Sequence, residues 1–342
     1  MSGQQIGPAP WFAEIAGGPE TARAEWWRAA DGVRLRVMIA QPSRRPRALV
    51  AILPGRTEWI EKYGRVAAAL VARGHAVVVP DWRGQGLSDR VARNRPVGHV
   101  RDFAEYQTDL AAVLAAARDA VGPLPLLLVS HSMGGTIALR ALASGLTARA
   151  AAFFGPLWGM PWPLARRLAT RVLVRLLVTV LRPLGRDTDY LPGAGPIWGP
   201  RHVSFARNRL THDPEEWARL GAHLRAHPEL MVAGPSVGWF DAVLTELAAL
   251  RRLPVPDVPA LVMAGDDDRV VSMAAIENRL SGWSSARLQR IPGAYHEVLM
   301  ERPAARDAAL AAMGALFDDV LAASDKVPVA SPAASTRFRS PG

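Results

Sequence analysis

The sequence contains no cysteine and almost no lysine. The absence of cysteine excludes disulfide bonds, thiolate metal sites and a cysteine nucleophile. Lys62 and Lys326 are the only lysines among 41 basic residues, and the other 39 are arginines. A GC-rich genome explains this preference for arginine more readily than a function does, so the basic composition alone predicts no activity.

The positive charge has no accompanying motif. The formal net charge is +10 and the sequence pI is about 11.0. Because no RNA- or DNA-binding motif is present, we do not predict nucleic acid as a partner. An anionic substrate and the anionic surface of a membrane both remain open as partners of this charge.

The sequence also lacks a long apolar run. Residues Met1–Gly18 have neither the charged start nor the apolar stretch of a signal peptide. The longest apolar run, Val172–Leu181, is interrupted by Arg175 and is shorter than the roughly 20 residues that cross a bilayer. We therefore predict a cytoplasmic protein and leave open a peripheral contact with the inner membrane surface.

Short apolar runs alternate with helical patterns along most of the chain. The runs that fit strands are Val33–Ile39, Ala48–Leu53, Ala76–Pro80, Pro125–Ser130, Ala150–Phe154, Ala260–Met263 and Ala286–Ile291. The helical stretches between them include Glu61–Arg73, Phe103–Val121 and Met133–Ala143. Continuously apolar strands that are followed by helices are typical of a parallel sheet buried on both faces. The pattern predicts an α/β fold with a mostly parallel sheet flanked by helices.

The strand pattern stops near residue 155 and resumes near residue 259, which predicts an insertion. We assign residues 25–155 and 246–324 to the α/β core and residues 156–245 to a helical cap. Insertions of this kind often form a lid over an active site. The two ends, 1–24 and 325–342, show no sustained pattern and are expected to be poorly ordered.

The sharpest local signal lies in residues 126–135. An apolar strand runs directly into Ser132, Met133 and Gly134 and then into a helix. A serine on such a tight strand-to-helix turn is lifted clear of the backbone, where a substrate can reach it. Ser130 stands where the usual motif has its first glycine. The alternative is a serine that merely caps the helix, but we favour a catalytic nucleophile.

A serine nucleophile needs a base, and the base needs an acid that orients it. Asp268 follows one late strand and His296 follows the next, so both lie where sites form in open α/β sheets. The order serine, acid, histidine is that of the strand–serine–helix hydrolases. Asp266 and Asp267 precede Asp268 directly, and we favour Asp268 as the partner of His296.

Two backbone amides are expected to stabilise the oxyanion that forms during attack. Met133 follows the predicted nucleophile at the start of a helix, and Arg56 lies in the loop after the strand that ends at residue 53. The side chain of Arg56 is predicted either to meet an anionic group of the substrate or to form a salt bridge with Glu58 or Glu61.

These motifs together resemble the monoacylglycerol lipase and lysophospholipase group of α/β hydrolases, and most closely its bacterial lysophospholipase-like branch. The matching stretches are residues 53–63, 81–88, 98–100, 131–135, 208–214, 234–239, 265–271 and 295–301. The resemblance covers roughly residues 25–322. One departure is Pro54-Gly55, which replaces the His-Gly pair common elsewhere in the superfamily.

The resemblance implies an α/β-hydrolase fold with an inserted cap. The nucleophile position of the family falls on Ser132, its acid on Asp268 and its base on His296. Its oxyanion positions fall on Arg56 and Met133. The resemblance thus implies the same five residues as the motifs do.

The cap contains a predicted amphipathic helix over residues 163–182. Arg167, Arg171, Arg175 and Arg182 fall within an arc of roughly 80° on this helix, and leucines and valines cover much of the rest. Such a helix is suited to an anionic membrane surface. The alternative, which we favour slightly, is that its apolar side chains pack on the core. Trp158, Trp198 and Trp239 are candidates for binding an acyl chain.

The sequence therefore predicts a serine hydrolase of acyl-chain esters, of the lysophospholipase or monoacylglycerol lipase type. It implies no metal ion and no organic cofactor. The open alternatives are an acyltransferase, a short-chain carboxylesterase and a non-catalytic protein that binds lipid surfaces. Epoxide and haloalkane hydrolysis are disfavoured, because those reactions use an aspartate at the position of Ser132.

Overall fold

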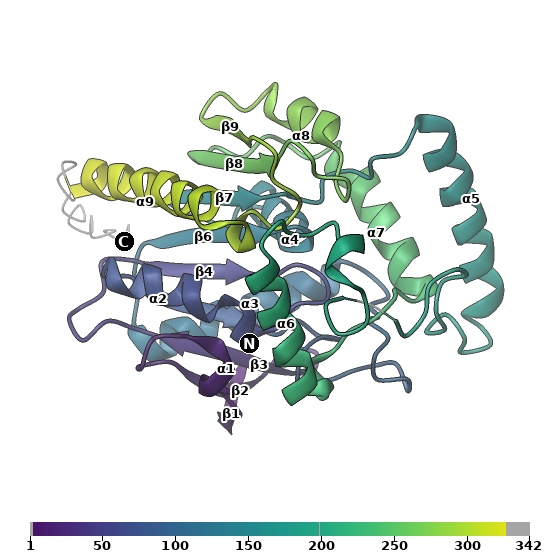
Figure 1. Cartoon of the computed structure of the whole chain (residues 1–342), viewed down its shortest axis with the longest axis horizontal. Helices are drawn as coiled ribbons and strands as arrows, with labels where there is room; N and C mark the ends of the chain where they lie inside the picture. Colours follow the sequence, from purple (N-terminus) through teal and green to yellow (C-terminus); the bar gives the residue numbers. More distant parts are fainter. Residues whose placement is uncertain (1–2, 198, 326–342) are drawn as a thin grey trace, which may run out of the picture.

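The structure, a computed structural model, describes residues 3–197 and 199–325, which form a nine-stranded sheet with helices on both faces (Figure 1). The strand order is β1-β2-β3-β5-β4-β6-β7-β8-β9. The strands are β1 Gln4–Ala9, β2 Arg23–Arg28, β3 Arg34–Ala40, β4 Leu49–Leu53, β5 Ala76–Pro80, β6 Leu126–His131, β7 Ala150–Phe154, β8 Ala260–Gly265 and β9 Ala286–Ile291. Pairing is antiparallel from β1 to β5 along this order and parallel from β5 to β9.

The central strands are buried on both faces, which explains their continuously apolar sequences. In β4, Val50 and Ile52 belong to one core, whereas Ala51 and Leu53 belong to the other. Alternate side chains of a strand point to opposite faces, so both faces of a central strand must be apolar. The prediction of a mostly parallel α/β sheet flanked by helices is confirmed.

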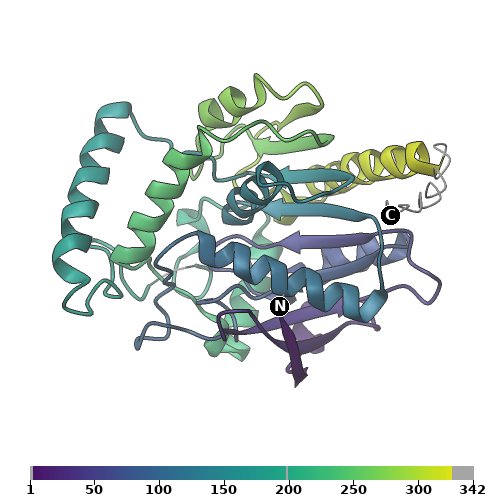
Figure 2. The ribbon, with the colours of Figure 1, turned by 180° about the vertical axis from the view of Figure 1, so that it is seen from behind.

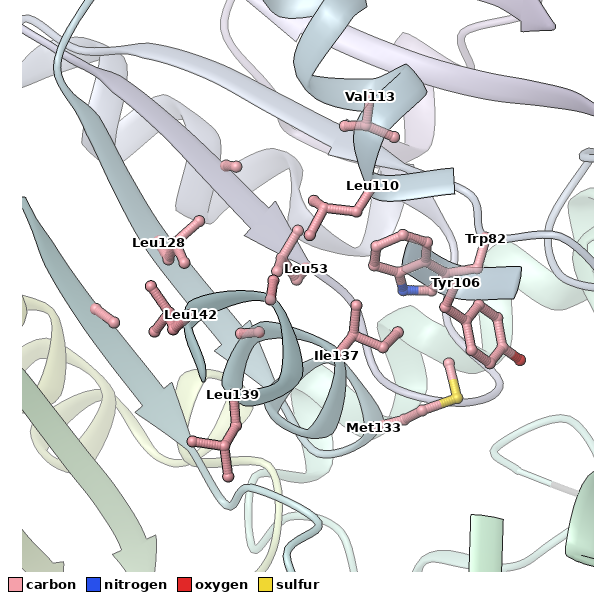
Figure 3. Packing of buried hydrophobic residues seen from close by; sticks show 14 of the residues in the cluster. Leu53, Trp82, Tyr106, Leu110, Val113, Leu128, Met133, Ile137, Leu139 and Leu142 are labelled. Atoms are coloured by element: carbon pink, nitrogen blue, oxygen red, sulfur yellow. The ribbon is translucent and has the colours of Figure 1, made fainter. Parts of the chain in front are cut away.

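Helices on the two faces cover these two cores. The helices are α1 Ala13–Ala16, α2 Gly64–Ala72, α3 Ala104–Val121, α4 Met133–Ala143, α5 Leu164–Leu181, α6 Pro214–Ala226, α7 Val237–Leu250, α8 Met273–Leu280 and α9 Pro303–Asp325. Helices α2 and α9 pack on one face of the sheet, and α3 and α4 pack on the other (Figures 1 and 2). Figure 3 shows α3 and α4 meeting the sheet through Leu110, Val113, Ile137 and Leu142.

The expectation that residues 1–24 are poorly ordered is wrong for the described part of this segment. Residues 4–9 form β1, which pairs with β2 at the edge of the sheet. The side chains of β1 are mostly exposed, and the strand contains Gly7 and Pro8. Its order comes from main-chain pairing with β2, which leaves no apolar pattern in the sequence. The predicted tail, 325–342, lies outside the described residues after Asp325.

The segment predicted to form a cap, residues 156–245, lies between β7 and β8. It contains α5, the short helices η2 Phe205–Arg207 and η3 Pro228–Leu230, α6 and most of α7. Helix α7 continues past the predicted boundary at residue 245. It contacts both α5 of the cap and α4 of the core. Helix α5 lies farthest from the sheet, with α7 between them (Figures 1 and 2).

The packing interpretation of α5 is wrong for most of its apolar residues. Only Val174 and Val178 of this helix are buried. Six of its large apolar side chains are 55–64% exposed: Leu164, Leu168, Val172, Leu173, Leu176 and Val180. Two of the arginines expected on this helix and at its end are paired within the cap, Arg175 with Asp241 and Arg182 with Asp187. The helix therefore points an apolar stripe away from the core.

Candidate active site

Ser132 sits at the turn between β6 and α4 in a conformation that few non-glycine residues adopt. Its φ is 49° and its ψ is −115°. Its backbone N–H donates to the carbonyl of Phe154 at 3.1 Å, and its carbonyl accepts from Gly135 and Leu157 at 2.9 Å. These bonds hold the strained turn, and strain of this kind is typical of functional sites.

Small residues are required around this turn because neighbouring backbone lies very close. A Cβ added at Gly134 would lie 2.0 Å from the Leu53 carbonyl oxygen, and one added at Gly135 would lie 2.6 Å from Cβ of Pro156. Ser130, in the position of the usual first glycine, is buried within the strand. Serine is small enough for this position, so the departure from the motif leaves the turn intact.

Asp268 and His296 follow β8 and β9 and meet beside Ser132. The carboxylate of Asp268 lies 2.7 Å from Nδ1 of His296. It also accepts the backbone N–H groups of Val270 and Val271, at 2.7 and 3.2 Å. Both side chains are almost fully shielded from solvent. Their geometry matches that of an acid orienting an imidazole.

The environment of Asp268 favours its ionised form. Burial raises the pKa of this carboxyl, but the charge and hydrogen bond of His296 and the two backbone amides outweigh burial and lower the pKa below its ordinary value. Asp266 and Asp267 are exposed, and Asp266 pairs with Arg290 instead. Of the three consecutive aspartates, Asp268 is therefore the one that contacts His296.

Ser132 and His296 line the same cavity, but no hydrogen bond joins the Ser132 hydroxyl to His296 within the described chain. In hydrolases this contact often tightens only when substrate is bound. Ser132 and His296 thus face one cavity, and Asp268 joins them through its contact with His296, but the hydrogen-bond chain is not complete.

The backbone N–H groups of Arg56 and Met133 are the predicted oxyanion donors. Neither group donates a hydrogen bond to any described residue. The loop that carries Arg56 is held from both sides, because the Gly55 N–H donates to Glu58 and the Thr57 N–H donates to Gln85. Preorganised donors of this kind stabilise negative charge as it develops on a substrate.

The cavity has a volume of about 500 Å³ and mixes apolar and cationic side chains. Its apolar lining includes Leu157, Met160, Val203, Leu210, Trp217 and Trp239. Trp239, predicted to bind an acyl chain, thus lines the cavity. Trp217, on α6, is a lining residue that the sequence did not reveal, because a tryptophan on a cap helix gives no sign of the cavity it faces.

Trp158, also predicted to bind an acyl chain, does not line this cavity. Trp158 is buried against Phe153 and donates to the carbonyl of Gly135, and it borders a separate cavity of about 620 Å³. That second cavity contains none of the predicted catalytic residues. The assignment of Trp158 to the substrate pocket is therefore wrong for this structure, because its ring packs into the core instead. Trp198 lies outside the described residues.

A buried charged cluster lies beside the predicted triad. Lys62 contacts Glu58 and Glu297 at 2.6 Å, and Nδ1 of His131 lies 2.8 Å from Glu58. The rings of His131 and His296 are 4.7 Å apart between centroids. His131 therefore packs beside the predicted base and is paired with a carboxylate. The sequence signal was the rarity of lysine, since Lys62 is one of only two lysines in the chain and follows Glu58 by four residues.

The charges in this cluster are mutually stabilised. Burial raises the pKa of Glu58, but Lys62 and His131 outweigh burial and bring the pKa well below its ordinary value. Burial lowers the pKa of His131, but Glu297 and Glu58 reverse this and raise it. Ligand atoms of Glu58, His131 and Glu297 lie within 4.8 Å of one another. Because the Lys62 ammonium already contacts both carboxylates, these residues fit a metal ion poorly.

The Arg56 side chain forms neither of the salt bridges proposed for it. Glu58 is taken by Lys62 and His131, and Glu61 is taken by Arg36 at 2.8 Å. The guanidinium instead lies over the ring of Trp239, with 4.8 Å between Cζ and the ring centroid. The salt-bridge alternative is therefore wrong, because both carboxylates have closer cationic partners.

No helix in the described part of the chain is both long and apolar enough to span a membrane. Helix α5 is 18 residues long, but arginines interrupt its apolar face.

The arrangement is that of a serine hydrolase of the α/β-hydrolase fold, and solved structures share the fold. A soluble variant of monoglyceride lipase from Saccharomyces cerevisiae superposes with a TM-score of 0.69 at 19% identity, over 91% of this chain and 99% of the other. A carboxyl esterase from Bacillus coagulans gives a TM-score of 0.69 at 16% identity, over 89% of this chain and 100% of the other.

Sequence relatives define the family more closely. Lysophospholipase L2 of Escherichia coli K12 is 31% identical over 330 residues, which cover 90% of this chain and 92% of the relative. A monoacylglycerol lipase of Mycolicibacterium smegmatis is 27% identical over 278 residues, which cover 79% and 88%. The family model described as serine aminopeptidase, S33, matches residues 44–303. The chain belongs to this S33 family of hydrolases, within its lysophospholipase and monoacylglycerol lipase group.

Proposed function

We propose that this enzyme hydrolyses the carboxylic ester of an acyl-chain lipid, with Ser132 as nucleophile, His296 as general base and Asp268 as the orienting acid. The observation that carries the proposal is the 2.7 Å contact between Asp268 and His296, whose imidazole lines the same cavity as the strained Ser132. Such a constellation has the parts that acyl transfer to serine requires.

The proposed reaction has two halves. Ser132 Oγ attacks the ester carbonyl carbon as His296 takes the hydroxyl proton, and the oxyanion accepts the N–H groups of Arg56 and Met133. The carbon–oxygen bond then breaks, and His296 gives the proton to the departing alcohol. Water attacks the acyl-enzyme with His296 again as base, which releases the fatty acid and restores Ser132.

A lysophospholipid or a monoacylglycerol is the proposed substrate. The apolar part of the cavity suits an acyl chain, and its volume lies within the range of small-molecule sites. The names of the relatives, lysophospholipase and monoacylglycerol lipase, indicate the same class of ester.

An ester panel tests this proposal. It contains nitrophenyl esters of increasing chain length, monoacylglycerols and lysophospholipids, each measured with the wild-type enzyme and with Ser132→Ala. We expect turnover of the lipid esters, and loss of that turnover in Ser132→Ala. Hydrolysis of short esters alone would contradict the lipid assignment, and unchanged activity in Ser132→Ala would contradict the nucleophile. Recovery of an acylated alcohol when an acceptor is added would favour acyl transfer instead.

We also propose that the apolar stripe of α5 contacts an anionic membrane surface. The stripe consists of six exposed residues, Leu164, Leu168, Val172, Leu173, Leu176 and Val180. Contiguous exposed apolar surface of this kind marks an interaction site. Arg166 and Arg171 lie on the same helix and form no ion pair with a described residue. Their positive charge is complementary to an anionic lipid surface.

Vesicle sedimentation tests the membrane contact. We expect the wild-type protein to bind vesicles that contain phosphatidylglycerol more strongly than vesicles of phosphatidylcholine alone, and Leu173→Ser with Leu176→Ser to weaken that binding. The matched control is Val91→Ser, which alters an exposed apolar residue outside the cap. Equal binding by the double variant would contradict the proposal, as would a stable dimer in light scattering that the double variant abolishes.

A further inference from the structure

The guanidinium of Arg56 is a charged group at the cavity of Ser132, and none of the described carboxylates pairs with it. Its Nε and Nη2 atoms are shielded from solvent, and neither has a hydrogen-bond acceptor among the described residues. Burial lowers the pKa of Arg56 to about 10, which leaves the side chain charged at neutral pH. A buried charge without a partner is costly, so such a group is expected to serve a ligand.

The surroundings of Arg56 hold its side chain without neutralising it. The guanidinium lies over the Trp239 ring, and a Cβ added at Gly98 would lie 3.2 Å from Nη2. The nearby phenols of Tyr106 and Tyr190 favour the charged form only weakly compared with burial. The side chain is thus positioned by an aromatic face and a glycine, and it lines the cavity of Ser132.

The rest of the cavity is also positively charged. Arg207, Arg209 and Arg269 line it, are exposed, and form no ion pair with a described residue. The two glutamates that line it, Glu58 and Glu297, both contact Lys62. Both carboxylates are therefore paired with Lys62. A ligand that enters the cavity meets arginines whose charge no described carboxylate neutralises. Such a site attracts anions and raises their local concentration.

We infer that Arg56 binds the phosphate of the substrate's head group, and that the enzyme therefore selects acyl esters that carry a phosphate close to the ester. This inference rests on the proposed function, because it assigns the head group of the same substrate. A guanidinium presents paired N–H donors that match two phosphate oxygens, which a neutral glycerol head group does not offer.

The position of Arg56 in the chain supports this assignment. Its backbone N–H is the proposed oxyanion donor, and the same residue lines the cavity and holds its guanidinium over Trp239. In a glycerol-based lysophospholipid, the ester carbonyl and the phosphate are also separated by a short chain of single bonds. One residue can therefore contact both groups of one substrate, and the three exposed arginines at the cavity would draw it in.

Substitution of the Arg56 side chain separates the two roles of the residue. Arg56→Met and Arg56→Gln keep the backbone N–H, so the oxyanion donor is retained while the guanidinium is lost. We expect kcat/KM for a lysophosphatidylglycerol to fall roughly 10- to 100-fold, and kcat/KM for the monoacylglycerol of the same acyl chain to change little. Arg56→Lys should lie between, because it keeps the charge but loses the paired donors.

The matched control is Arg44→Gln, which removes one exposed arginine at the opposite end of β4 and should leave the substrate ratio unchanged. Thermal melting of each variant establishes that it is folded. An equal loss for both substrates would assign Arg56 to shaping the oxyanion loop and would overturn the inference. If kcat/KM fell for neither substrate, the inference would be overturned as well.

A binding measurement makes the inference independent of turnover. Glycerol 3-phosphate is titrated into Ser132→Ala, and into Ser132→Ala with Arg56→Met. We expect measurable binding that the second substitution removes. If the wild-type enzyme hydrolysed no ester yet this binding were present, the proposed function would fail while the phosphate site stood. Equal binding by both proteins would overturn the phosphate site alone.

Discussion

At the scale of single residues, Asp268 differs in its contacts from the two aspartates that precede it. Asp268 contacts His296 and accepts two backbone N–H groups, whereas Asp266 and Asp267 are exposed. The difference arises from the turn after β8, which directs successive side chains to different sides. A role in orienting the base should therefore belong to one of these three residues only.

We expect Asp268→Asn to lower kcat by on the order of 10³- to 10⁴-fold, because the amide cannot stabilise the imidazolium that forms on His296. Asp267→Asn is the matched control, since it makes the same chemical change one residue away at an exposed site. Steady-state kinetics on a single ester, with circular dichroism to verify folding, measure the effect. Similar losses in the two variants would remove the special role assigned to Asp268.

At the scale of elements, one ammonium group joins two parts of the chain that are far apart in sequence. Lys62, in the short helix η1 Ile60–Tyr63, contacts Glu58 in the preceding loop and Glu297 after β9. All three side chains are buried. This contact fixes the loop that carries Arg56 relative to the turn that carries His296.

Lys62→Met should destabilise the fold by about 3–5 kcal/mol, because it leaves two buried carboxylates without their cation. The loss should shrink at acidic pH, since removal of the Lys62 charge leaves burial, which raises the pKa of Glu58, less opposed. Urea unfolding at pH 7 and at pH 5 measures both effects. In the control, Arg47→Met, an exposed pair with Asp318 is removed, and about 1 kcal/mol or less should be lost. A cost as small as that of the control would mean that the cluster relaxes or admits water.

The elements also show which signals the sequence carries. Strands β4 to β8 were predictable, because a strand buried on both faces must be apolar throughout. Strand β1 was not, since it is held by main-chain hydrogen bonds and leaves its side chains exposed. The outward stripe of α5 could not be assigned either, because the same amphipathic pattern fits a helix that packs inward and one that contacts lipid.

At the scale of the whole molecule, the site is assembled from loops that follow separate strands. Ser132 follows β6, Asp268 follows β8 and His296 follows β9, so parallel strands bring distant residues to one edge. This order could be inferred from the sequence. The surroundings of the Arg56 side chain could not be inferred. Which cation pairs with Glu58 or Glu61 depends on which one lies closest in the folded core.

The stability of the whole fold should depend on pH through a histidine far from the active site. His75, just before β5, is fully buried and packs edge-on against Phe317 of α9. Neither of its ring nitrogens has a hydrogen-bond partner in the described structure. Burial and the charge of Arg47 lower the pKa of His75 to about 4, against an ordinary value of 6.5.

Between these two values the unfolded chain binds the proton and the folded chain does not, so acid favours unfolding. The contribution of His75 should be present in full above pH 6.5 and should be lost as the pH falls to 4, by on the order of 2–3 kcal/mol. His75→Leu should flatten the stability profile in this window. Urea unfolding at half-unit steps of pH gives both profiles, and an equal slope in His75→Leu and wild type would show that other groups control the acid sensitivity.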